Sequence, residues 1–265
     1  MLVNVKAIVL DLDGTLLKKD DTISSRNKEF LMEQKKQGIK IILATGRPIN
    51  MTLKYHEELQ LDTPLICLNG AVIFDRLKQN ILEQSIISPV EATMVFDIVS
   101  DHYAKVMISH TSRANYEMIN LIGDKILNHG PIEPKGIYPN KYEPLLKLSV
   151  HFQNVASASY AYAKLLSHFE IANWGDSFEI TKKSITKWHA LQNVLSSFQI
   201  LPQEVVAFGD GPNDIEMLKN VGCGVAMENG RFMVKKVAKY VTLDHENDGI
   251  TDFFSRQLTK STLII

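Results

Sequence analysis

Short apolar runs, rich in β-branched residues, recur along the chain and are separated by longer segments with helical spacing. The runs are VKAIVL (5–10), IKIILA (39–44), PLICL (64–68), EVVAF (204–208), GVAM (224–227) and YVTL (240–243). Strands that alternate with helices form parallel sheets covered on both faces, and such strands are apolar on both sides. The pattern therefore predicts an α/β fold with a doubly wound parallel sheet.

Local signals predict a helix between the first two strands. Ser24 and Ser25 offer an N-cap, residues 30–37 have helical spacing, and Gly38 stands where a helix ends. Pro48 falls in the first turn of the next helix, where its missing N–H costs nothing. The first two strands are therefore joined by a helix, as parallel neighbours require.

The middle of the chain has a different pattern, with two half-exposed strands, two helices and a proline-rich loop. These elements are KLSVHF (147–152), FEITKK (178–183), the helices 89–102 and 156–169, and the loop 131–144. Strands and helices of this kind form a separate α+β layer. We therefore expect a discontinuous core domain, residues 1–80 and 185–265, with an inserted α+β domain over residues 81–184.

Composition and charge limit the partners of the protein. The 265-residue chain has 29 basic and 30 acidic side chains, so it lacks the basic surface that attracts nucleic acid or an anionic membrane. No stretch approaches the ~20 apolar residues of a membrane span. Cys67 and Cys223 lie in apolar runs and are expected to be buried free thiols. We expect a cytoplasmic protein, a monomer or weak homodimer, without nucleic-acid or membrane partners.

Polar residues stand at the ends of four predicted strands. They are Asp11, Thr45, Asn69 and Asp210. The carboxyl ends of the strands form the ligand crevice of a doubly wound sheet, so these side chains are expected at one place. Asp13 alternates with Asp11, and an extended backbone would direct both carboxylates to the same side.

Carboxylates this close together need a cation. Asp11 and Asp13 would face Asp210 and Asp214, and their mutual repulsion would be strong without a positive ion. Magnesium prefers oxygen ligands, takes one or two carboxylates plus water, and leaves room for a phosphate. The sequence therefore predicts a magnesium site.

Three further residues could bind a phosphate beside this ion. Thr45 supplies a hydroxyl, Gly46 an N–H that a ligand can approach closely, and Lys187 a positive charge. Carboxylates, a magnesium ion and phosphate donors are together the components of a site for phosphoryl transfer.

Four motifs, in order and spacing, resemble the haloacid dehalogenase superfamily, in its Cof-type phosphatase branch. They are DLDGT (11–15), TGR (45–47), Lys187 in KWHAL, and GDGPND (209–214), accompanied by NGA (69–71) and NDGI (247–250). The resemblance implies a magnesium-dependent phosphatase in which Asp11 is the nucleophile and forms an aspartyl-phosphate. Asp13 would be the general acid for the leaving oxygen and then the base for the attacking water.

The same resemblance implies roles for the remaining site residues. The metal would be bound by Asp11, Asp210 and the backbone carbonyl of Asp13. The phosphate would be bound by Thr45, Gly46, Lys187, Asn213 and the backbone N–H of Leu12. Asp214 would support the metal site, as such sites generally require. Trp188 departs from the family, which usually has glycine after the motif lysine.

The substrate and the phosphoryl acceptor stay open. Expected substrates are small phosphorylated metabolites, such as sugar phosphates, flavin mononucleotide or pyridoxal phosphate, selected by the inserted domain as a cap over the site. A phosphomutase would differ only in its acceptor. A non-catalytic, receiver-like phosphate-binding module would not need Asp13, and a glycosyltransferase with a DxD metal site would leave Thr45 and Lys187 without a role.

Candidate substrate contacts in the insertion are isolated histidine, arginine and aromatic residues, which are more often packing or surface residues. They are His102, Tyr103, His110, Arg113, Tyr116 and Trp174. Arg47, next to the phosphate motif, is a better candidate, and it could equally pair with an internal carboxylate.

Overall fold

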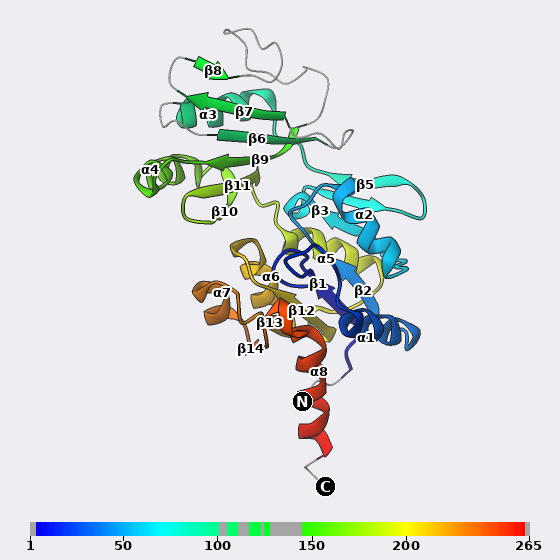
Figure 1. Cartoon of the computed structure of the whole chain (residues 1–265). Coiled ribbons are helices and arrows are strands. Elements are labelled where there is room, and N and C mark those ends of the chain that lie inside the picture. Colours follow the sequence, from blue (N-terminus) through cyan, green and yellow to red (C-terminus); the bar gives the residue numbers. More distant parts are fainter. Residues whose placement is uncertain (1–3, 101–104, 111–116, 123–124, 128–144, 263–265) are drawn as a thin grey trace.

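The computed structural model describes residues 4–100, 105–110, 117–122, 125–127 and 145–262, and the side chains of 4–99 and 145–257 among them (Figure 1). Its core sheet has five parallel strands in the order β14-β13-β12-β1-β2. They are β1 (Ala7–Leu10), β2 (Lys40–Leu43), β12 (Val205–Gly209), β13 (Cys223–Ala226) and β14 (Tyr240–Val241). The predicted α/β fold with a parallel sheet is confirmed, but the predicted strand at 64–68 belongs to a separate antiparallel sheet.

Helices cover both faces of this core sheet. They are α1 (Ser25–Lys36), α2 (Ile49–Glu58), α5 (Lys187–Ser197), α6 (Ile215–Asn220), α7 (Phe232–Val237) and α8 (Gly249–Thr262). Because side chains alternate along β1, Ile8 and Leu10 pack in one apolar cluster while Ala7 and Val9 pack in another. The strand is therefore buried on both sides, which explains its continuous apolar run.

The local helix signals were correct for the first helix. The Ser24 hydroxyl accepts a hydrogen bond from the backbone N–H of Asn27 at the start of α1, and Gly38 has a φ of 90° just after its end. This left-handed conformation suits glycine because it has no Cβ. Pro48 is the N-cap residue of α2, one position before the helix that was expected to contain it.

A second sheet, here called the cap sheet, has six antiparallel strands in the order β10-β11-β9-β6-β7-β8. They are β6 (Lys105–His110), β7 (Glu117–Ile122), β8 (Lys125–Leu127), β9 (Leu145–His151), β10 (Phe169–Asn173) and β11 (Ser177–Lys182). Strands β9 and β11 were predicted, but the expectation that β9 is half-exposed was wrong, because all of its residues except His151 are buried. The proline-rich loop expected over 131–144 lies outside the described residues.

Two helices pack on the cap sheet, α3 (Pro89–Ser100) and α4 (Val155–Leu165). Leu148 and Val150 of β9 join the apolar cluster between these helices and the sheet. The alternate residues Lys147 and Ser149 therefore lie on the opposite face, where they line a cavity shared with the core. Figure 1 shows this sheet beside the region where the core strands end.

A third, small antiparallel sheet is formed by residues that come after β2 and before the cap sheet in the sequence. Its strands are β3 (Leu65–Cys67), β4 (Val72–Asp75) and β5 (Asn80–Gln84). An isolated parallel bridge between Ala44 and Ile66 joins β3 to the edge of the core sheet. The sequence did not predict β5 because all five of its residues are exposed, so burial imposes no alternation on them.

Short 3₁₀ helices occupy several connections: η1 (Leu68–Gly70), η2 (Pro202–Glu204), η3 (Pro212–Asp214) and η4 (His245–Asn247). Cys67 and Cys223 are buried free thiols, as expected. In the ranges that the structure describes, every helix is too short or too polar to cross a membrane.

Candidate active site

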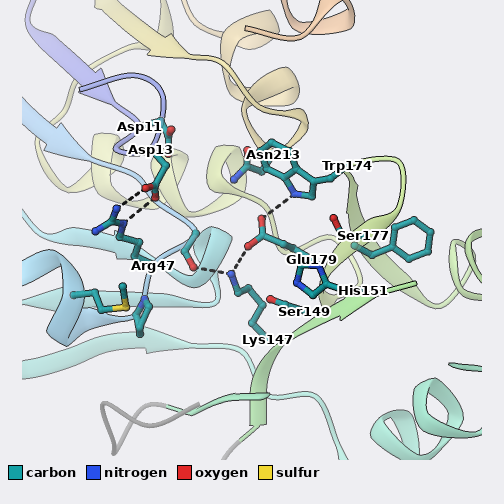
Figure 2. Close-up of a pocket in the computed structure, with 14 residues that line it drawn as sticks. Asp11, Asp13, Arg47, Lys147, Ser149, His151, Trp174, Ser177, Glu179 and Asn213 are labelled. Carbon is teal, nitrogen blue, oxygen red and sulfur yellow. Dashed lines mark hydrogen bonds and ion pairs between the residues drawn. The ribbon is translucent and has the colours of Figure 1, made fainter. Parts of the chain in front are cut away.

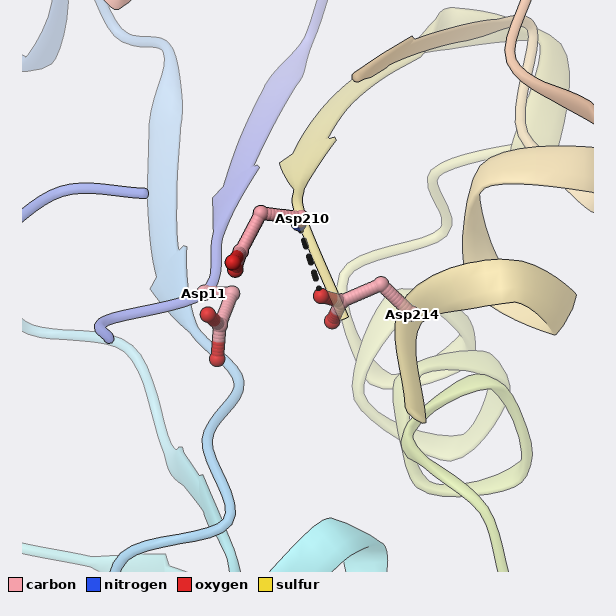
Figure 3. A group of neighbouring side chains, drawn as sticks. All are labelled: Asp11, Asp210 and Asp214. Carbon is pink, nitrogen blue, oxygen red and sulfur yellow. Dashed lines mark hydrogen bonds between the residues drawn. The ribbon is translucent and has the colours of Figure 1, made fainter. Parts of the chain in front are cut away.

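Three carboxylates from distant parts of the sequence meet at the carboxyl end of the core sheet. Asp11 follows β1, Asp210 follows β12, and Asp214 ends the 3₁₀ helix η3 (Figure 3). One ligand oxygen from each lies within 4.8 Å of the others. The expected convergence of polar residues at strand ends is therefore present for these acidic side chains.

Lys187 is the fully buried cation of this cluster. It is the first residue of α5, whose N-cap Thr186 accepts a hydrogen bond from the N–H of His189. Its Nζ donates to Asp11 Oδ1 at 2.6 Å and to Asp214 Oδ1 at 2.7 Å. Burial alone would lower the pKa of Lys187, but the charges of Asp11 and Asp214 outweigh burial and raise it above its ordinary value. Lys187 is therefore held in its charged form.

Asp214 is committed to contacts within the protein. Besides accepting from Lys187 through Oδ1, it accepts hydrogen bonds through Oδ2 from the backbone N–H groups of Asp210 and Gly211, both at 3.0 Å. This carboxylate therefore fixes the turn that carries Asp210 (Figure 3). Its geometry suits a supporting residue better than a metal ligand.

Asp11 and Asp210 lie where the described part of the protein supplies too little positive charge to favour their ionised forms. Burial, with the charges of Asp214 and Asp210, raises the pKa of Asp11 well above its usual range despite Lys187. Burial and the charge of Asp214 raise the pKa of Asp210 to about 7. In the described part of the chain, Asp11 accepts only from Lys187 and Asp210 only from Thr15, each through Oδ1. Two carboxylates with free oxygens fit a hard divalent cation.

Asp13 is held apart from the three clustered carboxylates. The backbone turns at Leu12, whose carbonyl accepts from Leu17 N at 2.9 Å, so the extended geometry assumed for Asp11 and Asp13 ends there. Asp13 lines the cavity, and its two oxygens accept from Arg47 Nε at 2.9 Å and Nη2 at 2.5 Å. The site thus has two separate clusters of charged groups.

Arg47 pairs with two exposed carboxylates, the first of which is Asp13, and it also lines the cavity, so both alternatives for it stay open. Its Nη2 also donates to Asp21 Oδ1 at 2.5 Å, and its guanidinium lies over the ring of Tyr55 at 5.7 Å. These contacts hold Arg47 and Asp13 together at one wall of the cavity (Figure 2).

Thr45 and Gly46 form a tightly packed loop after β2. The Thr45 hydroxyl accepts from the N–H of Arg47 at 3.1 Å, and its carbonyl accepts from the N–H of Asn69 at 3.0 Å. A Cβ on Gly46 would lie 3.0 Å from Asn69 Oδ1 and 3.1 Å from Glu179 Oε1. A side chain at position 46 would therefore crowd the cavity wall.

Leu12 and Asn213 complete the set of residues expected at the phosphate. The side chain of Leu12 is buried in the core, so only its backbone is available to a ligand. Asn213 lies in η3, lines the cavity, and donates through Nδ2 to Asn69 Oδ1 at 2.9 Å.

The cap sheet contributes two cavity residues that were not predicted from the sequence. Lys147 of β9 and Glu179 of β11 form a nearly buried ion pair, and Lys147 Nζ also donates to the carbonyl of Gly46 at 2.7 Å. They line a cavity of about 580 Å³ (Figure 2). The alternation of polar and apolar residues in KLSVHF and FEITKK could have indicated them, because it places the polar residues of each strand on one face.

Of the candidate contacts in the insertion, Trp174 is in the described region and lines the cavity. Its Nε1 donates to Glu179 Oε2 at 3.3 Å. His102, Tyr103, Arg113 and Tyr116, and the side chain of His110 in β6, lie outside that region. Trp188, which replaces the family's usual glycine, packs partly buried against an apolar cluster of the core.

Comparisons with known proteins agree with this geometry. Residues 8–254 match the family model of the haloacid dehalogenase-like hydrolases. A 5-amino-6-(5-phospho-D-ribitylamino)uracil phosphatase of Bacillus subtilis (strain 168) is 30% identical, over 93% of this chain and 95% of the relative. A pyridoxal phosphate phosphatase of Escherichia coli (strain K12) is 29% identical, over 96% and 98%.

Solved structures give the same result. A sugar phosphatase of subclass IIB of the superfamily superposes with a TM-score of 0.78 and 25% sequence identity, over 98% of this chain and all of that one. The shared architecture therefore extends through both the core sheet and the cap sheet. The chain belongs to the haloacid dehalogenase-like hydrolases, in which it is a phosphatase of the Cof type, subclass IIB.

Proposed function

We propose that this protein hydrolyses phosphomonoesters of small metabolites with magnesium, through an aspartyl-phosphate on Asp11. The observation that carries this proposal is the placement of Asp11. Its carboxylate lies at a strand end on the cavity, where one oxygen accepts from Lys187 and the other has no protein partner among the described residues. An oriented carboxylate beside a fixed cation is suited to attack on a phosphoryl group.

Asp11 and Asp210 are the proposed side-chain ligands of magnesium, with the backbone carbonyl of Asp13 as a third ligand. When bound, magnesium would neutralise charge on the phosphoryl oxygens. Asp214 would keep Asp210 in place through the backbone hydrogen bonds described above. The proposed phosphate donors are Thr45, Gly46, Lys187, Asn213 and the backbone N–H of Leu12.

The chemistry would proceed in two balanced steps. In the first, a carboxylate oxygen of Asp11 attacks phosphorus, the bond from phosphorus to the leaving oxygen breaks, and Asp13 gives that oxygen a proton. In the second, Asp13 takes a proton from water as the water oxygen attacks phosphorus and the bond to Asp11 breaks. Inorganic phosphate and the free Asp11 carboxylate result.

Arg47 would position Asp13. Its guanidinium donates to both oxygens of that carboxylate and holds it at the cavity wall. Arg47 is therefore a supporting residue in this proposal.

The proposed substrates are small phosphorylated metabolites, such as sugar phosphates, flavin mononucleotide or pyridoxal phosphate. The cavity of about 580 Å³ lies within the usual range for small-molecule sites. Two relatives named above act on a phosphoribityl pyrimidine and on pyridoxal phosphate by their names. We further propose residues 81–184 as the domain that selects among such substrates.

Phosphate release from a panel of such esters, with magnesium, tests the proposal. We expect the wild type to release phosphate and Asp11→Asn to lose at least about a thousandfold in kcat, because an amide is a poor nucleophile. The control is Asp20→Asn, an exposed residue that contacts Thr22. Retained activity in Asp11→Asn would contradict the covalent mechanism. Formation of an isomerised sugar phosphate without free phosphate would indicate a mutase.

A further inference from the structure

The nearly buried carboxylate of Glu179 is in the cap sheet, yet it contacts the core. Its Oε2 accepts from Asn69 Nδ2 at 3.1 Å and from Trp174 Nε1 at 3.3 Å, and its other oxygen pairs with Lys147. Burial works to raise the pKa of Glu179, but Lys147 and Asn69 outweigh it and lower the pKa. The ionised carboxylate can therefore only accept hydrogen bonds.

The contact with Glu179 fixes the orientation of the Asn69 amide. Because the carboxylate accepts, Asn69 must turn Nδ2 toward it, and its Oδ1 then faces the opposite way. That oxygen accepts from Asn213 Nδ2 at 2.9 Å. Asn69 has a φ of 57°, a left-handed conformation that asparagine tolerates, so its backbone is also specifically placed.

Asn213 is thereby oriented as a donor. One hydrogen of its Nδ2 is donated to Asn69. Its Oδ1 lies close to Gly211, because a Cβ built on that glycine would be 2.6 Å from Asn213 Oδ1. Among the residues that the structure describes, no acceptor takes the second hydrogen of Nδ2, which is available to a ligand in the cavity that Asn213 lines. A phosphate oxygen needs such a donor, and a flipped amide would present its oxygen instead.

We propose that Glu179 is a positioning residue, which couples the seating of the cap sheet on the core to phosphate binding by fixing Asn69 and, through it, Asn213. This inference rests on the proposed function for the role of Asn213. Lys147 strengthens the same coupling, because it joins Glu179 to the carbonyl of Gly46, a proposed phosphate donor in the loop after β2. A cap sheet lifted from the core would leave the Asn69 amide free to flip.

The test measures binding of orthovanadate, a tetrahedral phosphate analogue, by calorimetry with magnesium, together with kcat and KM. The variants are Glu179→Ala, Asn69→Ala and their double mutant. Glu170→Gln is the matched control, because it lies on the adjacent strand β10 and outside the proposed machinery. A coupling through Asn69 predicts that each single variant weakens binding about tenfold and that the double variant is no weaker than the worse single one.

A merely structural role for Glu179 gives a different result. It predicts vanadate affinity equal to that of the control, or losses that multiply to about a hundredfold in the double variant, and either result overturns the coupling. Glu179→Gln keeps an acceptor for Asn69 and should recover part of the affinity that Glu179→Ala loses.

The same measurements separate this inference from the proposed function. Vanadate binding with the expected pattern, in a wild type that hydrolyses no ester of the panel, would support the coupling and overturn the proposed substrate class. If the wild type hydrolyses an ester and the Glu179 variants bind vanadate as tightly as the wild type does, the coupling is overturned and the proposed function stands. A wild type that neither binds vanadate nor hydrolyses an ester would overturn both.

Discussion

Lys187 Nζ lies 2.6 Å from Asp11 Oδ1, although the two residues are 176 positions apart in the sequence and Lys187 is fully buried. The same ammonium reaches Asp214 Oδ1 at 2.7 Å. A buried ammonium between two carboxylates offsets their mutual repulsion. Removal of either partner leaves an uncompensated buried charge, which is far more costly than the loss of a surface ion pair.

Lys187→Met should therefore destabilise the protein by about 3–5 kcal/mol in EDTA. The remaining carboxylates of Asp11 and Asp214 would have no cation, and the methionine would fill most of the space. Urea denaturation measures this loss. Lys219→Met, an exposed lysine of α6, is the control and should change stability by less than about 0.5 kcal/mol. A loss near that of the control would contradict the structural role of Lys187.

Gly14→Ala and Gly38→Ala form a matched pair of glycine variants. Both glycines have left-handed φ angles, 71° and 90°, so each substitution should cost roughly 1–2 kcal/mol of unfolding free energy. A Cβ on Gly14 would lie 2.5 Å from Asp210 Oδ2, whereas Gly38 has open space around it. We expect about tenfold weaker magnesium activation in Gly14→Ala alone.

Magnesium titrations of phosphate release compare these two variants with the wild type. Equal magnesium activation in both would show that Asp210 does not need its present position.

Magnesium should raise the melting temperature of the wild type, and EDTA should abolish this effect. A ligand that binds the folded state stabilises it by about 2.7 kcal/mol at a concentration 100 times its Kd. Asp210→Asn removes one of the two carboxylates proposed to bind magnesium, so we expect this variant to lose the shift. Differential scanning calorimetry checks this expectation, with Asp20→Asn as the control. A full shift in Asp210→Asn would remove that residue from the metal site.

His56 should make stability fall at acidic pH. It is buried, with Nε2 at 2.8 Å from the carbonyl of Thr63 and Nδ1 accepting from Arg76 Nε, and burial lowers its pKa. The unfolded chain therefore binds a proton at His56 at a higher pH than the folded protein does. Its contribution is complete above about pH 6.5 and is lost as the pH falls from there toward the lower folded pKa.

Urea denaturation between about pH 5 and pH 7.5 measures this slope, which should be smaller in His56→Gln by up to about one proton. His168→Gln, an exposed histidine near the end of α4, is the control and should keep the wild-type slope. An unchanged slope in His56→Gln would refute the assignment.

The sequence by itself predicted the site residues that directly follow a buried strand. Strand β1 is buried on both faces, so it must be apolar throughout, and Asp11 can stand only where the strand leaves the core. The same physical rule marked Thr45, Asn69 and Asp210. The helix cap Ser24 and the left-handed Gly38 were readable because those signals extend over only a few residues.

Other contacts depended on the tertiary structure alone. Asp13 turns to Arg47 because the backbone bends at Leu12, and no pattern of alternation contains that bend. Glu179 reaches Asn69 across 110 residues, since two sheets with separate cores are seated on each other. Local sequence patterns record which face of a strand is apolar. Which polar groups meet across two such faces is decided only when the layers pack, because those contacts join residues with no fixed spacing along the chain.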